Sequence, residues 1–143
     1  MFAKITLVFL SFFLMTCSDQ ADPEPEPVDC STVICTLNFV TITVSVKDAS
    51  GEPVSLDNYE VIDNETGENL AADFNGEEYK YLKEQGVYPI LSDGNRVQYQ
   101  NSTATLTFKG TIHNEKVIDE TYEVAADCCH VSLITGNTVI VLE

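Results

Sequence analysis

Five cysteines are the residues of this sequence whose type and spacing could do chemistry. Cys17 stands alone near the N-terminus, and the other four form two close pairs, Cys30 with Cys35 and Cys128 with Cys129. Thiols at such spacings can form disulfides, bind a metal ion or exchange electrons. The spacing of the four later cysteines favours the first of these.

These four cysteines allow three disulfide pairings. A bridge between Cys30 and Cys35 would force the adjacent Cys128 and Cys129 to pair with each other, which is a strained geometry. Adjacent side chains in a strand point to opposite faces, so two crossed bridges are more economical. We therefore expect two disulfides that join the first and last strands of the domain, in either of the two crossed connectivities.

The same residues allow an alternative, a small envelope protein that binds metal or exchanges thiols through Cys128, Cys129 and His130. The first cysteine pair fits the ligand spacing of structural zinc, but adjacent cysteines rarely point to one ion. A redox thiolate needs a lowered pKa, and the neighbouring Asp127 raises it. The sequence therefore favours a protein with no metal site and no cofactor.

No residue pattern indicates catalysis. His113 lies at a predicted hairpin tip and His130 in a predicted strand, with no spacing that selects a Ser or Asp partner for either. The acidic segment 63–68 has oxygen ligands without the register of a calcium loop, so we expect a solvated turn there. The sequence predicts that this protein is not an enzyme.

Composition excludes two classes of partner. The chain has 143 residues, which fits one domain, and 7 basic against 23 acidic residues give a formal charge of −16. Nucleic-acid binding depends on clustered Lys and Arg, and so does docking of a basic patch on an anionic membrane. We therefore expect no nucleic-acid partner and no basic membrane-binding patch.

The first 16 residues have the features of a signal peptide. Lys4 is followed by an apolar run over residues 5–15, which is about half the roughly 20 residues needed to span a bilayer as a helix. The run ends in Leu14-Met15-Thr16-Cys17, which resembles the lipobox of bacterial lipoprotein precursors. In that family a peptidase cuts before the cysteine, which is then acylated, so the resemblance implies a signal peptide over 1–16 and a membrane-anchoring lipid on Cys17.

Residues 17–29 comprise Cys17, which we expect to be acylated, and an acidic linker. Proline and glutamate alternate over 23–27, which favours extended polyproline II geometry and a disordered linker. Ser18 and Asp19, directly after Cys17, resemble the surface-export tag of some Gram-negative lipoproteins. The predicted location is a lipid anchor in the outer membrane at the cell surface, with a periplasm-facing anchor as the alternative.

Residues 30–143 read as an all-β domain. Apolar and polar residues alternate with a period of two in several short segments separated by Gly, Pro, Asn and Asp, which is typical of a sandwich. We predict a single antiparallel β-sandwich of about seven strands with at most one short helix. The expected strands lie in 40–46, 59–62, 88–91, 103–110, 117–124 and 130–142, and the helix in 77–85.

The segment Val46-Lys47-Asp48-Ala49-Ser50-Gly51-Glu52-Pro53 resembles the V-x-D-x-x-G-x-P pattern of carboxypeptidase regulatory-like (transthyretin-like) domains. Those domains are seven-stranded sandwiches, generally non-catalytic and common on bacterial surfaces. An immunoglobulin version is less favoured, because the chain lacks Trp and Tyr122 lies six residues before Cys128. The resemblance implies a non-catalytic binding or accessory structural module of the cell envelope.

A protein or glycan at the cell surface is the expected partner of such a module. Exposed aromatic side chains usually bind glycans, and the candidates in this sequence are Tyr79, Tyr81, Tyr88 and Tyr99. Their spacing is equally consistent with packing inside the sandwich, so the sequence assigns none of them to a site.

Overall fold

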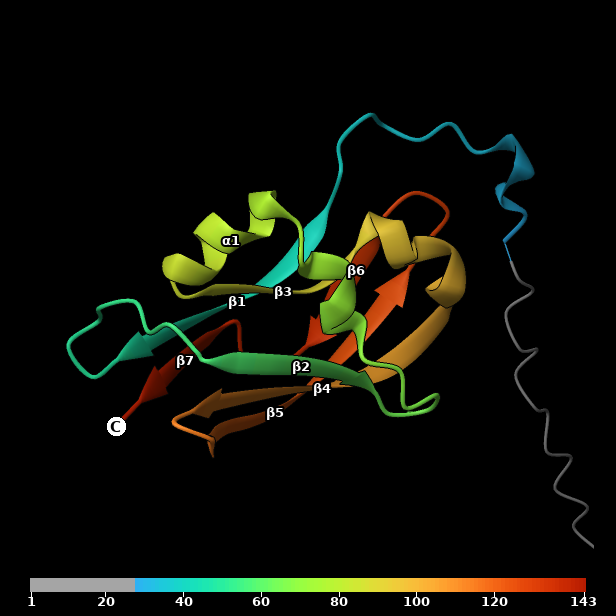
Figure 1. Cartoon of the computed structure of the whole chain (residues 1–143). Helices are drawn as coiled ribbons and strands as arrows, with labels where there is room; N and C mark the ends of the chain where they lie inside the picture. The colour runs from blue at the N-terminus through green and yellow to red at the C-terminus, as the bar shows by residue number, and fades with distance from the viewer. Residues whose placement is uncertain (1–27) are drawn as a thin grey trace, which may run out of the picture.

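Two β-sheets lie face to face in the computed structural model, which describes residues 28–143 (Figure 1). The predicted signal peptide, Cys17 and nearly all of the predicted linker lie outside the described residues. One sheet has the order β3 (Val87–Ser92), β1 (Thr41–Asp48), β7 (Val139–Leu142). The other has the order β2 (Asn58–Asp63), β4 (Ser102–Ile112), β5 (Glu115–Ala126), β6 (Val131–Thr135). The predicted seven-stranded sandwich is confirmed.

Helical segments are short and lie beside the sheets. The α-helix α1 (Glu77–Glu84) falls within the predicted 77–85 and packs against β3, and three 3-10 turns accompany it: η1 (Cys30–Thr32), η2 (Leu70–Phe74) and η3 (Asp93–Tyr99). Within residues 28–143, no helix is both long enough and apolar enough to cross a membrane.

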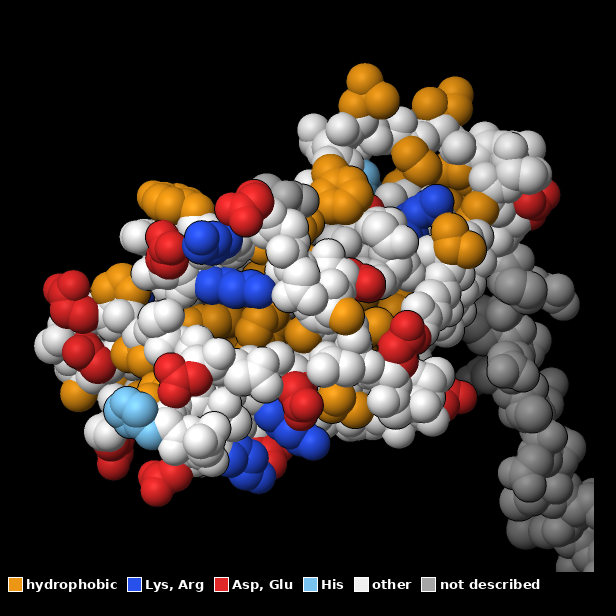
Figure 2. Space-filling view, in the orientation of Figure 1, with side chains coloured by type: hydrophobic (Ala, Val, Ile, Leu, Met, Phe, Trp, Pro, Cys, Tyr) orange, Lys and Arg blue, Asp and Glu red, His pale blue; other side chains and the backbone are white. Residues whose placement is uncertain are grey.

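Before β1, residues 28–40 form a segment that we call the N-terminal arm. It contains η1 and arches away from the sheets before it enters β1 (Figure 1). Apolar side chains project from it into solvent, whereas charged side chains are spread over the body of the sandwich (Figure 2).

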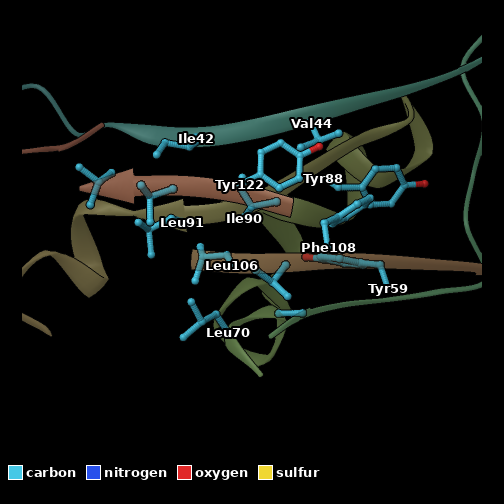
Figure 3. Packing of buried hydrophobic residues seen from close by; sticks show 14 of the residues in the cluster. Ile42, Val44, Tyr59, Leu70, Tyr88, Ile90, Leu91, Leu106, Phe108 and Tyr122 are labelled. Atoms are coloured by element: carbon cyan, nitrogen blue, oxygen red, sulfur yellow. The ribbon is translucent and has the colours of Figure 1, made fainter. Parts of the chain in front are cut away.

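The core lies between the two sheets, as the alternation of β1 predicts. Ile42, Val44 and Val46 are buried, while the residues between them are only partly covered. Opposite them lie apolar side chains of the other sheet, among them Leu106 and Phe108 (Figure 3). Complete burial of each such side chain contributes about 1.5–3 kcal/mol, so this layer holds the sheets together.

Three aromatic rings fill one end of the core. The ring centroids of Tyr59 and Tyr88 are 5.2 Å apart in an edge-on arrangement, and both rings contact Phe108 (Figure 3). The Tyr88 hydroxyl accepts a hydrogen bond from the backbone N–H of Leu56 at 2.7 Å and donates to the carbonyl of Val54 at 3.0 Å. The loop after β1 is therefore fastened to the core by a buried phenol.

Two local features can be compared with the sequence. Proline has no N–H to donate to a neighbouring strand, so Pro89 predicts an edge strand, and β3 is at the edge of its sheet, paired only with β1. The sequence also predicts a hairpin tip over residues 113–116, and the tip of the β4–β5 hairpin is shorter than that. His113 and Asn114 both have positive φ angles, 52° and 63°, so they form a two-residue turn and β5 begins at Glu115.

One strand pair departs from the predicted antiparallel arrangement. β1 and β7 run parallel, from Ser45 beside Val139 to Asp48 beside Leu142. The chain leaves β6 in one sheet and enters β7 in the other, so its last strand lies beside its first. The alternation of residues within 130–142 shows two strands but carries no information on which sheet each one joins.

Gly136 makes this change of sheet, and we predict that Gly136→Ala is strongly destabilising. Its φ is 135°, and an added Cβ would lie 2.3 Å from Cδ1 of the buried Tyr122 ring. We expect a loss of about 2–4 kcal/mol in the free energy of unfolding, measured with denaturant and intact disulfides. The control is Gly67→Ala, where φ is 76° and no atom lies within 4 Å of the added Cβ, so only the backbone strain of about 1 kcal/mol remains. Equal losses in the two variants would contradict the role of Tyr122.

Candidate functional site at the disulfide-bonded end of the sandwich

Two disulfides join the N-terminal arm to the turn between β5 and β6. Cys30 pairs with Cys128 and Cys35 with Cys129, across sequence separations of 98 and 94 residues. This is one of the two crossed connectivities that the sequence left open. We call the arm, η3 and the turn formed by residues 127–130 the disulfide-bonded end.

The cysteines do not lie in strands, which differs from the expected staple between first and last strands. The carboxylate of Asp127 accepts the backbone N–H groups of Cys129 and His130, at 2.6 and 2.7 Å, and so folds residues 127–130 into a turn. These hydrogen bonds also lower the pKa of Asp127. The bridges therefore attach a segment that precedes the first strand to a turn that precedes β6.

A second acidic residue, Asp93, connects three segments. Its Oδ2 accepts the backbone N–H of Val40 at 2.8 Å, and its Oδ1 accepts that of Val131 at 2.9 Å. Oδ2 also lies 2.8 Å from Nδ1 of His130. Burial alone would raise the pKa of Asp93, but these three partners outweigh it and hold the pKa below its ordinary value.

His130 lies between Asp93 and a hydroxyl. Its Nε2 is 2.9 Å from Oγ1 of Thr36 on the arm, so hydroxyl, imidazole and carboxylate follow one another as in a hydrolase triad. Sequence reasoning found no partner for His130, because Thr36 and Asp93 are 94 and 37 residues away in the chain. Only the disulfide-bonded arm brings the hydroxyl to the imidazole.

The surrounding donors show what this arrangement can do. An imidazole held by a carboxylate can accept a proton from a hydroxyl, but acyl transfer also needs N–H donors for an oxyanion. The backbone N–H groups of residues 129–131 are already used by Asp127 and Asp93. Those three N–H groups are therefore not free to bind an oxyanion, and the contacts of His130 join the arm to the sandwich.

The structure gives Cys128 and Cys129 other partners than the metal and thiol alternative needs. Both are in disulfides with the arm, so neither sulfur is a thiolate that could bind a metal ion, and the two are not bonded to each other as a redox pair would be. Among residues 28–143, no three His, Cys, Asp or Glu side chains are grouped so as to hold a metal ion. His113, the other histidine, lies at the tip of the β4–β5 hairpin.

The remaining sequence candidates lie mostly in the core. Tyr88 and Tyr99 are buried, Tyr79 packs edge-on against Phe74, and only Tyr81 has a well-exposed ring. In the acidic segment 63–68 the expected turn is present, but its first residue is not solvated. Asp63 is buried and accepts hydrogen bonds from the backbone of Glu65 and Thr66 and from the hydroxyl of Tyr99.

The arm carries a surface that sequence reasoning missed. Ile34 is 96% exposed, Leu37 is fully exposed and Phe39 is 65% exposed. A signal was available: no charged residue occurs from Cys30 to Val46, in a chain where charged residues make up 21%. Apolar side chains projecting from the arm are visible at the top of Figure 2.

An open cavity of about 770 Å³ lies at the other end of the sandwich, near the β4–β5 hairpin and the C-terminus. Its walls mix apolar and polar side chains, with Val54, Ile112 and Leu142 beside Asp48 and His113. The sandwich thus has two distinct ends, one apolar and disulfide-bonded, the other hollowed.

Comparisons with protein-family models, with curated proteins and with solved structures found no match to this chain. The class of protein therefore follows from the fold and the bridges alone. Disulfides form and persist in oxidising compartments. The chain is an extracytoplasmic, disulfide-bonded β-sandwich protein.

We predict that the two bridges stabilise the fold in a non-additive way. With either bridge present, the other closes a ring of only about eight residues (30–35 and 128–129), so removal of one bridge costs about 2 kcal/mol. Removal of both frees a loop of nearly a hundred residues and costs about 7 kcal/mol in all. The variants are the serine pairs Cys30→Ser with Cys128→Ser and Cys35→Ser with Cys129→Ser, alone and combined, measured by denaturant unfolding. A quadruple variant that loses only the sum of the two pairs would refute this coupling.

We also predict that Asp93 makes stability depend on pH. Its pKa is lower in the folded protein than in the unfolded chain, so its contribution is complete above pH 4 and is lost as the pH falls through the folded pKa. Asp93→Asn leaves a backbone donor without a partner and should cost about 1–3 kcal/mol at pH 7. The deficit should shrink in unfolding measurements at pH 3 and below. Glu120→Gln removes an exposed carboxylate from β5 and should follow the unmodified chain at every pH; a deficit of constant size for Asp93→Asn would rule out the linkage.

Proposed function

We propose that this chain is a non-catalytic, lipid-anchored protein of the bacterial cell envelope, and that its sandwich serves as a binding or accessory structural module. The anchor is a lipid on Cys17, after removal of residues 1–16, and residues 17–29 are the linker. The location is the outer membrane, facing the cell surface, with a periplasm-facing anchor as the alternative.

The observation that carries this proposal is the position of the disulfides relative to the linker. Cys30 follows the last linker residue directly, and both arm cysteines are bonded to a turn deep in the sequence. In a domain anchored through its N-terminal linker, these bridges tie the residues at which the linker enters the domain to the body of the sandwich. Disulfides also persist in the compartment where lipoproteins reside.

The turn after β1 supports the resemblance to transthyretin-like domains. Oδ1 of Asp48 accepts the backbone N–H groups of Ser50 and Glu52, at 2.8 and 3.0 Å, and Gly51 has a φ of 90°. Asp48 and Gly51 stand at the D and G positions of the V-x-D-x-x-G-x-P pattern. This is the geometry that such a pattern would need, and it favours a non-catalytic module.

The donors beside His130 support a non-catalytic role. In a hydrolase, N–H donors aimed at an oxyanion accompany the hydroxyl, imidazole and carboxylate. Here the backbone N–H groups on the His130 side, those of residues 129–131, are bonded to Asp127 and Asp93. We propose a protein or glycan partner at the cell surface, with the hollowed end of the sandwich as the face available to it.

We predict that Cys17→Ala releases the protein from the membrane. The unmodified chain, expressed in a Gram-negative bacterium, should incorporate an alkyne-labelled fatty acid, appear in the membrane fraction and start at residue 17 by intact mass. The variant should lose the label, because the acylated residue is gone and a stable anchor needs more than one acyl chain.

Ser18→Ala is the matched control, since it keeps Cys17 and alters only the resemblance to an export tag. It should remain labelled and in the membrane fraction. Protease treatment of whole cells then separates the two leaflets: digestion of the unmodified chain but not of the Ser18→Ala chain would support surface export. An unlabelled, soluble chain that starts at another residue would refute the anchor.

A further inference from the structure

We propose that the apolar tip of the N-terminal arm, formed by Ile34, Leu37 and Phe39, inserts into the surface of the bilayer that carries the lipid on Cys17. This inference rests on the proposed anchor. It assigns to the arm a second, reversible membrane contact and to the whole domain a fixed orientation on the membrane.

The exposure of these side chains is the first observation. Ile34 is 96% exposed, Leu37 fully exposed and Phe39 65% exposed, with Val28 and Val33 also in solvent nearby in the chain. Single exposed apolar residues are common, but a group of this size on one projecting segment marks an interaction surface. Figure 2 shows such side chains projecting from the arm beyond the body of the protein.

The charge pattern is the second observation, and it selects a bilayer as the occupant. The chain carries a formal charge of −16, yet the 17 residues from Cys30 to Val46 contain none of its charged residues. Acidic side chains would be repelled by an anionic membrane and are costly at membrane depth. From Cys30 onward the arm is free of that cost, and Asp29 is its only acidic residue, five positions before Ile34. Ser, Thr and Asn between the apolar residues suit the polar headgroup layer.

The arm is held open, so its apolar side chains cannot fold back onto the core. Cys35 lies between Ile34 and Leu37 and is bonded to Cys129. The hydroxyl of Thr36 is hydrogen-bonded to His130. These two fixed points lie in the middle of the tip, between Ile34 and Leu37, and hold its backbone in place while the apolar side chains are exposed. Insertion would therefore require little loss of conformational freedom.

The tether reaches the same end of the domain. Cys30, the first bridged residue of the arm, is 13 positions after Cys17 in the sequence. A linker of this length keeps the arm within roughly 40 Å of the acyl chains, at about 3.1 Å per extended residue. The effective concentration of bilayer at the tip is therefore high, and even a weak apolar contact is sufficient.

Absence of tryptophan from the natural sequence permits a direct test. Leu37→Trp gives the chain a single indole at the tip. The acylated protein is purified from membranes and reconstituted in vesicles of phosphatidylcholine and phosphatidylglycerol, with and without bromine atoms on the acyl chains. The indole emission should shift to the blue and lose roughly half its intensity with brominated lipid, because an inserted Trp lies at the headgroup level.

Val141→Trp is the matched control, since Val141 is an exposed apolar residue (56%) of β7 at the hollowed end. Its emission should be that of an indole in water in both kinds of vesicle. A third chain with Phe39→Trp, Ile34→Asp and Leu37→Asp should lose the quenching while its unfolding free energy stays unchanged, because the altered side chains are exposed.

The outcomes separate this inference from the anchor. If intact mass shows no acyl group on Cys17, the anchor fails and this inference fails with it. If Cys17 is acylated and Leu37→Trp behaves like Val141→Trp, only the insertion is overturned. A blue shift without bromine quenching that grows with protein density would also overturn it, and would assign the tip to a second copy of the chain.

Discussion

The two sheets of this sandwich are joined at one end by a single carboxylate. Asp93 follows β3 and binds the N–H of Val40, which leads into β1 of one sheet, and the N–H of Val131, the first residue of β6 in the other. Because charge-assisted hydrogen bonds are stronger than neutral ones, one side chain sets the relative position of three segments. The end of the arm at Val40, the start of β6 and the ring of His130 are all held by it, while Asp127 and the disulfides fix the turn and the rest of the arm.

The strands could be read from the sequence, because their pattern is local. The alternation of Ile42, Val44 and Val46 needs no knowledge of the rest of the chain, and neither does the effect of Pro89 on the position of β3. The parallel pairing of β1 with β7 could not be read in this way. It depends on Gly136, which carries the chain past the ring of Tyr122 from one sheet to the other.

Less of the candidate site could be predicted from the sequence, because its residues meet through contacts between distant parts of the chain. Parity of spacing reduced the disulfides to two crossed pairings, but the choice between them depends on how residues 127–130 turn around Asp127. Likewise, the partners of His130 come from the arm and from η3. Its contacts have the order of hydroxyl, imidazole and carboxylate, and the spacing of these residues in the sequence gave no sign of it.

The bridge between Cys30 and Cys128 also has a mechanical consequence. It closes the chain from Cys30 to Cys128, which includes every strand from β1 to β5, into a covalent ring. Tension applied to the chain ahead of Cys30 would therefore pass across the bridge to the β5–β6 turn before it reached β1. A pull from that side meets a covalent bond first, and the hydrogen bonds between β1 and its neighbours lie behind that bond in the path of the force.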